Sequence, residues 1–338
     1  MKQLKILVAD IGGTNARFGL VELGSGAEYS NSQQGFKATQ QITLKCASYP
    51  SIAAMAKAYC EQTGTPVPDY GCLAIAGPIE NGWAKMTNLD WAFSIEEMRQ
   101  ELGMIALDVI NDFAALAYAT PFLQKSEIKL LHPGNANPTS AIVVFGPGTG
   151  FGMAALVPDN DDWKLLPTEG GHCSFAPTTE KELAIRAFLA QKQDHVSIED
   201  ILSGRGLVSI YQALAHITGV QAQDFSPAEV STKGLANEDA LCREALETFC
   251  NILGSVAGDK ALSLGAKGGV FLGGGIIPKI APFIPQTDFI KRYQHKGPMA
   301  GYVGEIPVNM ILNDTAALVG TAAWLVNKTP ELKTAYNA

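Results

Sequence analysis

The sequence predicts an α/β protein made of two related domains around a cleft. The chain has 338 residues, which exceeds the ~250 to 300 residues at which a single hydrophobic core usually stops growing. Short apolar runs alternate with stretches of helical pattern, as is typical of α/β architecture. A pattern of strand, glycine turn and strand occurs twice, 135 positions apart. That spacing is too long for a solenoid repeat and suits a duplicated domain.

The first copy of this pattern is a hairpin near the N-terminus. Strand 6–10 is followed by Gly12 and Gly13, and strand 17–21 comes next. Glycines let backbone N–H groups approach a phosphate closely, and Thr14, followed by Asn15, can donate its hydroxyl. Asp10 could hold Mg²⁺ through water. Taken alone, the Gly-Gly pair is explained equally well by a plain hairpin turn.

The second copy consists of strand 142–145, a glycine turn at 146–150 and strand 153–157. Phe145 stands where the first copy has Asp10, so only the first hairpin can bind a metal ion through a carboxylate. The turn contains Gly148, Thr149 and Gly150. The carboxylate in one copy and the existence of the other favour phosphate binding over a plain turn.

The remaining elements alternate between helix and strand, and the second half is richer in helix. The pattern predicts helices at 52–60, 95–102, 113–119, 180–191, 206–216 and 237–264, and strands at 72–76, 108–110 and 270–272. Near the end, strand 308–312 and the apolar helix 315–326 could fold back onto the first half. We therefore expect a small discontinuous domain, residues 1–122 plus 313–338, and a larger domain, residues 123–312.

Other nucleotide-binding signatures are missing. The P-loop pattern G-x-x-x-x-G-K-[ST] does not occur, and the dinucleotide fingerprint fails because Phe151 stands where its third glycine would be. The protein-kinase motifs H-R-D and D-F-G do not occur either. The loop Gly273, Gly274 and Gly275 follows strand 270–272 and could pass along an adenosine, or it could be a simple strand-to-helix turn.

Asn111 and Asp112 stand between strand 108–110 and the helix after it, which places a carboxylate at the carboxyl end of a strand. Ligands favour this edge in open α/β sheets. Asp112 could accept the proton of an alcohol during phosphoryl transfer. The local alternative is a helix N-cap, for which Asn and Asp are both suited.

Three further segments could bind a sugar, and each also has a purely structural explanation. Glu169 and His172 flank two glycines and could hydrogen-bond neighbouring hydroxyls, or they could belong to a surface turn. Glu199 lies in a segment that resembles a helix start with Ser197 as its cap. Asn88 belongs to a polar segment beside an aromatic residue, where core packing is the alternative.

Composition restricts the partners and the location. The net charge is −8, and no cluster of Lys and Arg is long enough to follow a nucleic acid backbone. We find no targeting segment, and the uncharged stretch 141–158 is broken by glycines and Pro147. The six cysteines form no C-x-x-C pair, which favours reduced thiols. We expect a cytoplasmic protein with no nucleic acid partner and no membrane partner.

In number, order and spacing, these segments resemble the bacterial glucokinase family of the hexokinase and actin-like ATPase superfamily. The resemblance covers residues 7 to about 319. The matching segments are 10–17, 86–88 with 91–94, 110–113, 148–150, 169–172 with 175–177, 202–207 and 269–275. The related repressor-and-kinase branch carries a cysteine-rich zinc cluster beside its sugar-binding His, but here only Cys173 follows His172. We therefore expect no structural zinc.

The resemblance implies an actin-like (ribonuclease H-like) fold and ATP-dependent phosphorylation of D-glucose. It implies that Asp112 is the general base, and that Asn111, Glu169, His172 and Glu199 bind sugar hydroxyls. For the nucleotide, it implies that the phosphates and Mg²⁺ face Asp10, Gly12, Gly13 and Thr14, that Thr149 and its glycines lie opposite, and that 273–275 lies along the adenosine. A homodimer is the family-level expectation.

Other functions remain possible at this point. Fructose, mannose or an N-acetylated sugar could replace glucose, since they present the same hydroxyl chemistry. A sugar-sensing transcription repressor would need a DNA-binding segment before the first strand, where five residues precede Ile6. A filament-forming or chaperone ATPase of this fold would have no reason for the Glu-Gly-Gly-His turn.

Overall fold

The computed structural model of the protein describes residues 4–23, 36–86, 89–160 and 162–337. The chain divides into two compact units. Unit 1 comprises Met1–Glu127, Asn160–Leu165 and Asn313–Ala338. Unit 2 comprises Ile128–Asp159 and Leu166–Leu312.

Unit 1 contains a five-stranded sheet in the order β3-β2-β1-β4-β8 and a small sheet β5-β6-β7. The main strands are β1 (Leu4–Ile11), β2 (Asn15–Leu23), β3 (Thr39–Lys45), β4 (Tyr70–Ile75) and β8 (Ala106–Asn111). The small sheet consists of β5 (Ile79–Glu80), β6 (Trp83–Lys85) and β7 (Ala92–Ser94). The helices are α1 (Ile52–Thr63), α2 (Ile95–Leu102), α3 (Asp112–Ala119), α11 (Ala316–Lys328) and α12 (Pro330–Tyr336).

Unit 2 contains a six-stranded sheet in the order β12-β11-β10-β13-β14-β9, except that the first residues of β12, up to Leu165, are assigned to unit 1. Its strands are β9 (Ile128–His132), β10 (Ile142–Pro147), β11 (Phe151–Asp159), β12 (Asp162–Thr168), β13 (Gly269–Leu272) and β14 (Val308–Ile311). Its helices are α4 (Glu180–Leu189), α5 (Gly204–Thr218), α6 (Pro227–Ala236), α7 (Ala240–Leu264), α8 (Ile277–Ile280), α9 (Phe289–Gln294) and α10 (Ala300–Gly304).

The two main sheets repeat the same pairing. In unit 1, β1 is antiparallel to β2 and parallel to β4, which is parallel to β8. In unit 2, β10 is antiparallel to β11 and parallel to β13, which is parallel to β14. The predicted duplicated α/β fold is therefore confirmed. Each sheet places a hairpin and the ends of parallel strands at one edge.

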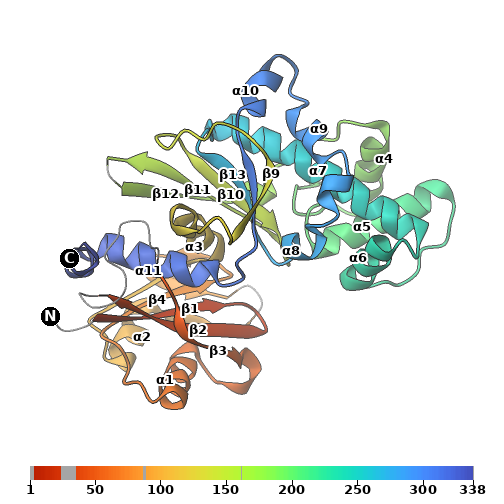
Figure 1. Ribbon diagram of the computed structural model, residues 1–338. Coiled ribbons are helices and arrows are strands. Elements are labelled where there is room, and N and C mark those ends of the chain that lie inside the picture. The colour runs from red at the N-terminus through yellow and green to blue at the C-terminus, as the bar shows by residue number, and fades with distance from the viewer. Residues whose placement is uncertain (1–3, 24–35, 87–88, 161, 338) are drawn as a thin grey trace. The chain divides into compact units, whose positions relative to one another are not determined.

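Helices cover both faces of the unit 1 sheet (Figure 1). On one face, α1 contributes Met55 and Tyr59 to a core that also contains Leu7 and Phe18 of the sheet. On the other face, α11 packs on β1 and β4 and runs against α3. The helices α3 and α11 approach so closely that a Cβ added at Gly320 would lie 1.8 Å from the carbonyl oxygen of Ala115. The position of α3 is therefore tightly constrained.

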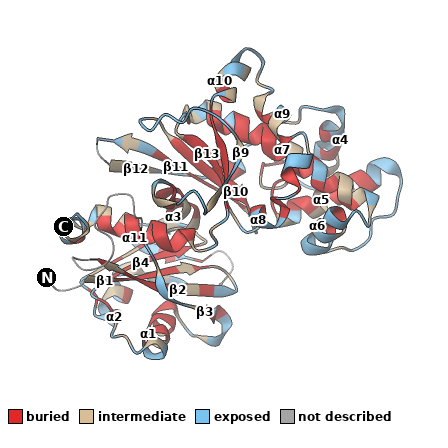
Figure 2. Cartoon of the chain, in the orientation of Figure 1, coloured by how far each residue is buried: buried red, intermediate tan, exposed pale blue. Residues whose placement is uncertain are grey.

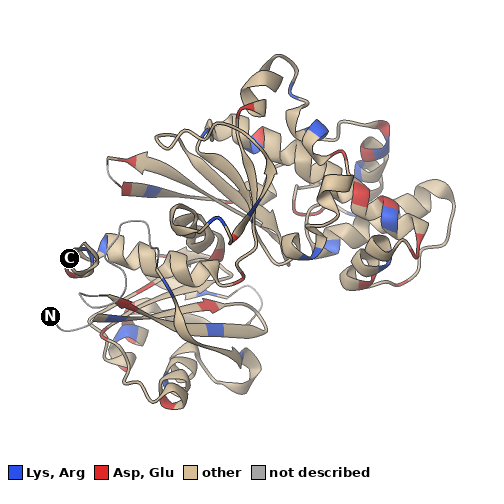
Figure 3. Cartoon of the chain, in the orientation of Figure 1, with Lys and Arg blue, Asp and Glu red and all other residues tan. Residues whose placement is uncertain are grey.

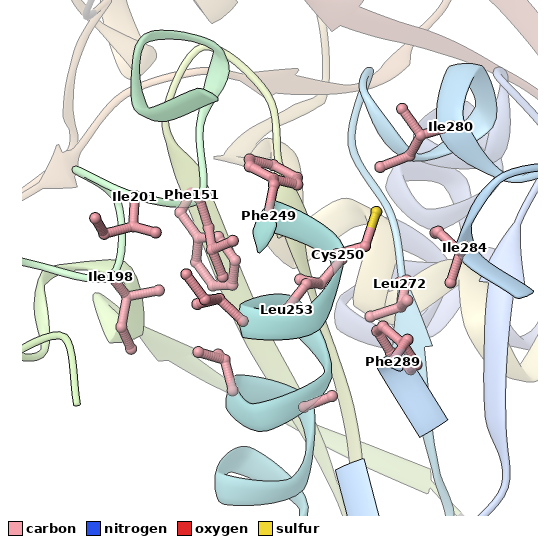
Figure 4. Packing of buried hydrophobic residues seen from close by; sticks show 14 of the residues in the cluster. Phe151, Ile198, Ile201, Phe249, Cys250, Leu253, Leu272, Ile280, Ile284 and Phe289 are labelled. Carbon is pink, nitrogen blue, oxygen red and sulfur yellow. The ribbon is translucent and has the colours of Figure 1, made fainter. Parts of the chain in front are cut away.

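The core of unit 2 is centred on α7, which is buried along most of its length (Figure 2). Figure 4 shows Phe249, Cys250 and Leu253 of this helix in the same cluster as Phe151 and Ile198. Because Phe151 begins β11 and Ile198 belongs to the segment before α5, the core fixes both of these segments.

The C-terminal part of the chain differs in one respect from the expectation. Strand 308–312 does not return to the first half, because β14 pairs with β13 and β9 within the unit 2 sheet. Helix α11 does pack within unit 1, on β1, β4 and α3.

Within the part of the chain that the structure describes, no helix has the length and apolar character needed to cross a membrane. Basic and acidic side chains are dispersed over both units (Figure 3).

Candidate active site

Asp10 lies at the end of β1, at the edge where the first hairpin turns. Gly12 N–H donates to Asn15 O at 3.0 Å, and Cys46 N–H donates to Thr14 O at 2.9 Å, which ties the turn to the segment after β3. Thr14 and Asn15 are exposed, whereas Gly12 and Gly13 are half-buried. The turn therefore presents its polar residues to solvent and keeps its backbone fixed.

The Asp10 carboxyl is half-buried, and burial raises its pKa to about 6, against a smaller lowering by the Arg17 charge. The Arg17 guanidinium itself donates to the Asp314 carboxylate at 2.9 Å and to the Asp314 carbonyl at 2.6 Å. Asp10 thus has a neighbouring charge that is already shared with another carboxylate. A buried carboxyl of this kind fits a divalent cation, which prefers oxygen ligands and would offset the cost of ionisation.

Asn111 and Asp112 lie at the same sheet edge, at the end of β8 and the start of α3. The Asn111 side chain is the N-cap, because its Oδ1 accepts from Phe113 N–H at 2.9 Å and Ala114 N–H at 3.3 Å. The capping explanation of this pair is therefore correct for Asn111. Asp112 occupies the first helical position instead.

The pKa of Asp112 is raised to about 7, chiefly by burial and then by the negative charge of Asp10. Hydrogen bonds from Phe113 N–H, at 2.9 Å, and from the Asn111 side chain act in the opposite direction. Strands β1 and β8 both flank β4, so their ends lie roughly 10 Å apart. Unit 1 therefore brings together two carboxyls with raised pKa values, one of them poised near neutral pH.

The second hairpin in unit 2 lies beside the Gly273–275 loop. Gly148 N–H donates to Gly150 O at 2.8 Å within the turn, and Gly273 N–H donates to Phe145 O at 3.0 Å. A Cβ added at Gly146 would lie 2.0 Å from Gly273 O, so only glycine permits this approach. Gly274 has a φ of +88°, which favours glycine. Thr149 and Gly275 are exposed at the same edge.

Glu199 lies in a turn between α4 and α5. Ser197 does accept from Asp200 N–H at 3.2 Å, but no helix begins there, because α5 begins at Gly204 with Ser203 as its N-cap. The Glu199 carboxylate accepts from Phe151 N–H at 2.8 Å and from Arg205 at 3.0 Å. The predicted helix start at Glu199 is therefore wrong, and Glu199 instead ties this turn to the start of β11.

The Glu169 and His172 turn adjoins the Glu199 turn. Gly170–His172 forms a single 3₁₀ turn in which His172 N–H donates to Glu169 O at 3.0 Å. Glu199 N–H donates to Gly171 O at 2.9 Å. Glu169 and His172 are exposed, while the two glycines between them are buried. Unit 2 therefore joins the Glu169–His172 turn, Glu199 and the start of β11, which follows the second hairpin turn, in one hydrogen-bond network.

Asn88 lies outside the described residues. Arg205 lies in the matching segment 202–207, and its contact with Glu199 becomes apparent only in the folded structure. Within the described ranges, no group of three or more His, Cys, Asp or Glu side chains is arranged to hold a metal ion.

Comparison with known proteins identifies the family. The glucokinase family model matches residues 7–328. The glucokinase of Saccharophagus degradans is 42% identical over 320 residues, covering 94% of this chain and 97% of that protein. The crystal structure of glucokinase from an Antarctic psychrotroph has a TM-score of 0.87 at 39% identity, covering 96% of this chain and 99% of that one.

A more distant structure, the glucokinase of Balamuthia mandrillaris in complex with glucose, has a TM-score of 0.76 at 20% identity, covering 96% of this chain and 94% of that one. This similarity supports the fold alone. The family model and the close relatives span nearly the whole sequence, including the segments that contain Asp10, Asp112 and Glu199. The chain therefore belongs to the glucokinase family.

Proposed function

We propose that this protein, a hexose kinase of the glucokinase family, transfers the γ-phosphoryl group of ATP to the primary hydroxyl of D-glucose, with Asp112 as the general base. The observation that carries the role of Asp112 is its pKa of about 7. A base is most effective when its pKa lies near the working pH. The glucokinase relatives support glucose as the acceptor.

The different positions of Asn111, the N-cap of α3, and Asp112, its first helical residue, support this role. Asn111 accepts from both Phe113 N–H and Ala114 N–H. Asp112 accepts from only the first of these two groups, so its carboxylate keeps lone pairs free for a substrate hydroxyl. When glucose and ATP bind, the glucose oxygen attacks the γ-phosphorus, the bond from that phosphorus to the bridging oxygen breaks so that ADP leaves, and the carboxylate accepts the hydroxyl proton. The proton then remains on the Asp112 carboxyl, whose burial favours the neutral form.

The family uses ATP as donor together with a divalent metal, and we propose Mg²⁺ at Asp10, held through water. The bound ion would neutralise negative charge on the transferred phosphoryl group. Gly12, Gly13, Thr14 and Asn15 would receive phosphate oxygens on backbone N–H groups and the threonine hydroxyl. In unit 2, Gly148, Thr149 and Gly150 would do the same, and Gly273–275 would lie along the adenosine.

We assign the sugar to Asn111, Glu169, His172 and Glu199, with Asn88 as a further ligand. The Glu199 carboxylate already has two protein donors. Each carboxylate oxygen has a second lone pair, so Glu199 can still accept from a sugar hydroxyl. The exposed Glu169 side chain accepts in the same way, and His172 can donate or accept.

The wider assignment follows from these roles. We propose that residues 1–122 with 313–338 form the domain of the first hairpin and the base. Residues 123–312 would form the domain of the second hairpin, the sugar ligands and the adenosine loop. We further infer a cytoplasmic homodimer with no structural zinc and with no nucleic acid or membrane partner.

The test is ADP release with Mg-ATP across glucose, fructose, mannose and N-acetylglucosamine, for the wild type and for Asp112→Asn. We expect glucose to give the highest kcat/KM and the substitution to lower kcat by about 10² to 10⁴. Asp288→Asn removes the same charge at an exposed site in unit 2 and is the matched control. Release of ADP without regard to the sugar would refute the kinase assignment. Unchanged turnover in Asp112→Asn would refute the role of Asp112.

A further inference from the structure

Lys260 is a buried lysine on α7 that lies beneath the Glu169–His172 turn. Only 9% of the residue is exposed. Its Nζ donates to the carbonyl oxygen of Gly170 at 3.2 Å. No sequence motif marks Lys260, because its turn partner is 90 positions away.

Burying an ammonium group is costly unless hydrogen bonds or opposite charges compensate. Lys296 offers a comparison. Its side chain is 10% exposed, and it donates to the carbonyl oxygen of Ser255, which lies on α7 as Lys260 does. Lys296 also pairs with the Asp259 carboxylate at 2.8 Å. Among the described residues, Lys260 has no such counter-charge, and the Gly170 carbonyl is its one hydrogen-bond partner. A buried cation therefore has its N–H directed at the turn.

The turn itself is tightly packed at its two glycines. A Cβ added at Gly170 would lie 2.3 Å from Met153 Sδ, and one added at Gly171 would lie 2.3 Å from Phe151 O. The glycine backbone thus lies directly against β11, while Lys260 binds the Gly170 carbonyl. The neighbouring Glu169 and His172 side chains remain exposed.

We propose that Lys260 is a positioning residue for sugar recognition. By holding the Gly170 carbonyl, it sets the orientation of the peptide that joins Glu169 to His172. The exposed side chains of Glu169 and His172 then point in fixed directions, because the backbone between them is held by a buried side chain. This role rests on the proposed function, because the turn is assigned to glucose.

The experiment compares Lys260→Met with the wild type. Methionine fills a similar volume without a donor or a charge, so the burial cost disappears along with the hydrogen bond. We expect the KM for glucose to rise about tenfold, while kcat and the KM for ATP stay within about twofold. The Tm should be equal to or above that of the wild type. Lys260→Gln, which keeps an N–H donor of shorter reach, should recover part of the glucose affinity.

Lys296→Met is the matched control. The Lys296 side chain is largely buried but bonds to Ser255 O and Asp259 instead of the turn, so its replacement should leave the KM for glucose unchanged. An unchanged KM for glucose in Lys260→Met would overturn the role. A lowered Tm with equal losses for both substrates would also overturn it, since that result describes a merely structural lysine.

Amide hydrogen exchange without any sugar separates this role from the glucose assignment. The His172 and Glu199 N–H groups, bonded to Glu169 O and Gly171 O, should exchange faster in Lys260→Met than in Lys296→Met. Unchanged exchange would refute the hold of Lys260 on the turn, whatever the substrate. A wild type that does not phosphorylate glucose would refute the proposed function but not this hold.

Discussion

Replacing Asp112 by asparagine should stabilise the protein while it abolishes most of the activity. Burial and the charge of Asp10 raise the pKa of Asp112 from 3.8 to about 7 in the folded state. The unfolded chain ionises this carboxyl freely, so above pH 4 the folded state is penalised for carrying it. An amide of the same shape is never ionised and escapes this penalty.

The size of the effect follows from the shift. A pKa difference of about 3 units corresponds to about 4 kcal/mol above pH 7, which is an upper limit. Asp112 is only half-buried, and asparagine must also lose water, so we expect a gain of about 1 to 2 kcal/mol at pH 8. For domains of this size that is a rise in Tm of roughly 2 to 8 °C.

The pH dependence has a definite sign. The pKa of the Asp112 carboxyl is higher in the folded state than in the unfolded state. Below the unfolded-state pKa the carboxyl does not reduce the stability of the protein, and as the pH rises from there toward the folded-state pKa the protein loses stability. The advantage of Asp112→Asn should therefore be absent below pH about 4, about one third complete at pH 5 and complete above pH about 7.

Thermal unfolding followed by circular dichroism at pH 5 and pH 8 measures this difference. Asp288→Asn, at an exposed site paired with Lys291, should change the stability by less than about 0.5 kcal/mol at either pH. An equal Tm change for Asp112→Asn at both pH values, or a lower Tm at pH 8, would show that the Asp112 carboxyl is not destabilised by burial.

Two further predictions follow from the same site. Because Asp112 must be ionised to act as a base, log kcat/KM for glucose should rise with unit slope below pH about 7 and then level off; a profile that is flat from pH about 5.5 to 8 would contradict this. In Gly150→Ala, the new Cβ would lie 2.4 Å from Glu199 Oε2 and displace this carboxylate, which we propose binds the sugar, so the KM for glucose should rise about tenfold. The added Cβ of Gly148→Ala meets nothing within 4 Å, so an equal rise there would refute this coupling.

Local signals in the sequence were sufficient for much of the fold. Helix α2 has the predicted bounds because Ser94 caps its start and Gly103, in the left-handed conformation, ends it. The predicted helix 237–264 begins late, at Ala240, because Asn237 ends another helix. That helix, α6, was missed although Ser226 and Glu229 form a readable capping box.

The candidate site was less accessible to local reasoning. For Asp112 and Glu199, the segment alone favoured a cap, and only the resemblance to a family indicated chemistry. The raised pKa of Asp112 is due first to burial and then to the charge of Asp10, which lies about 100 positions earlier and comes near Asp112 only through the order of the sheet strands. The partners of Glu199 and Lys260 are likewise set by tertiary packing, which no local pattern contains.

The contact between α3 and α11 has a consequence for how this gene can vary. Every single-nucleotide substitution that converts the Gly320 codon to another amino acid adds at least a Cβ, where 1.8 Å separates it from the Ala115 carbonyl. Each amino-acid change that one nucleotide step can produce at codon 320 is therefore expected to disturb the packing of α11 against α3. A saturation-mutagenesis screen for growth on glucose should find it as intolerant as codon 112. A shift of α3, the helix that begins with Asp112, would therefore need a compensating change in α11.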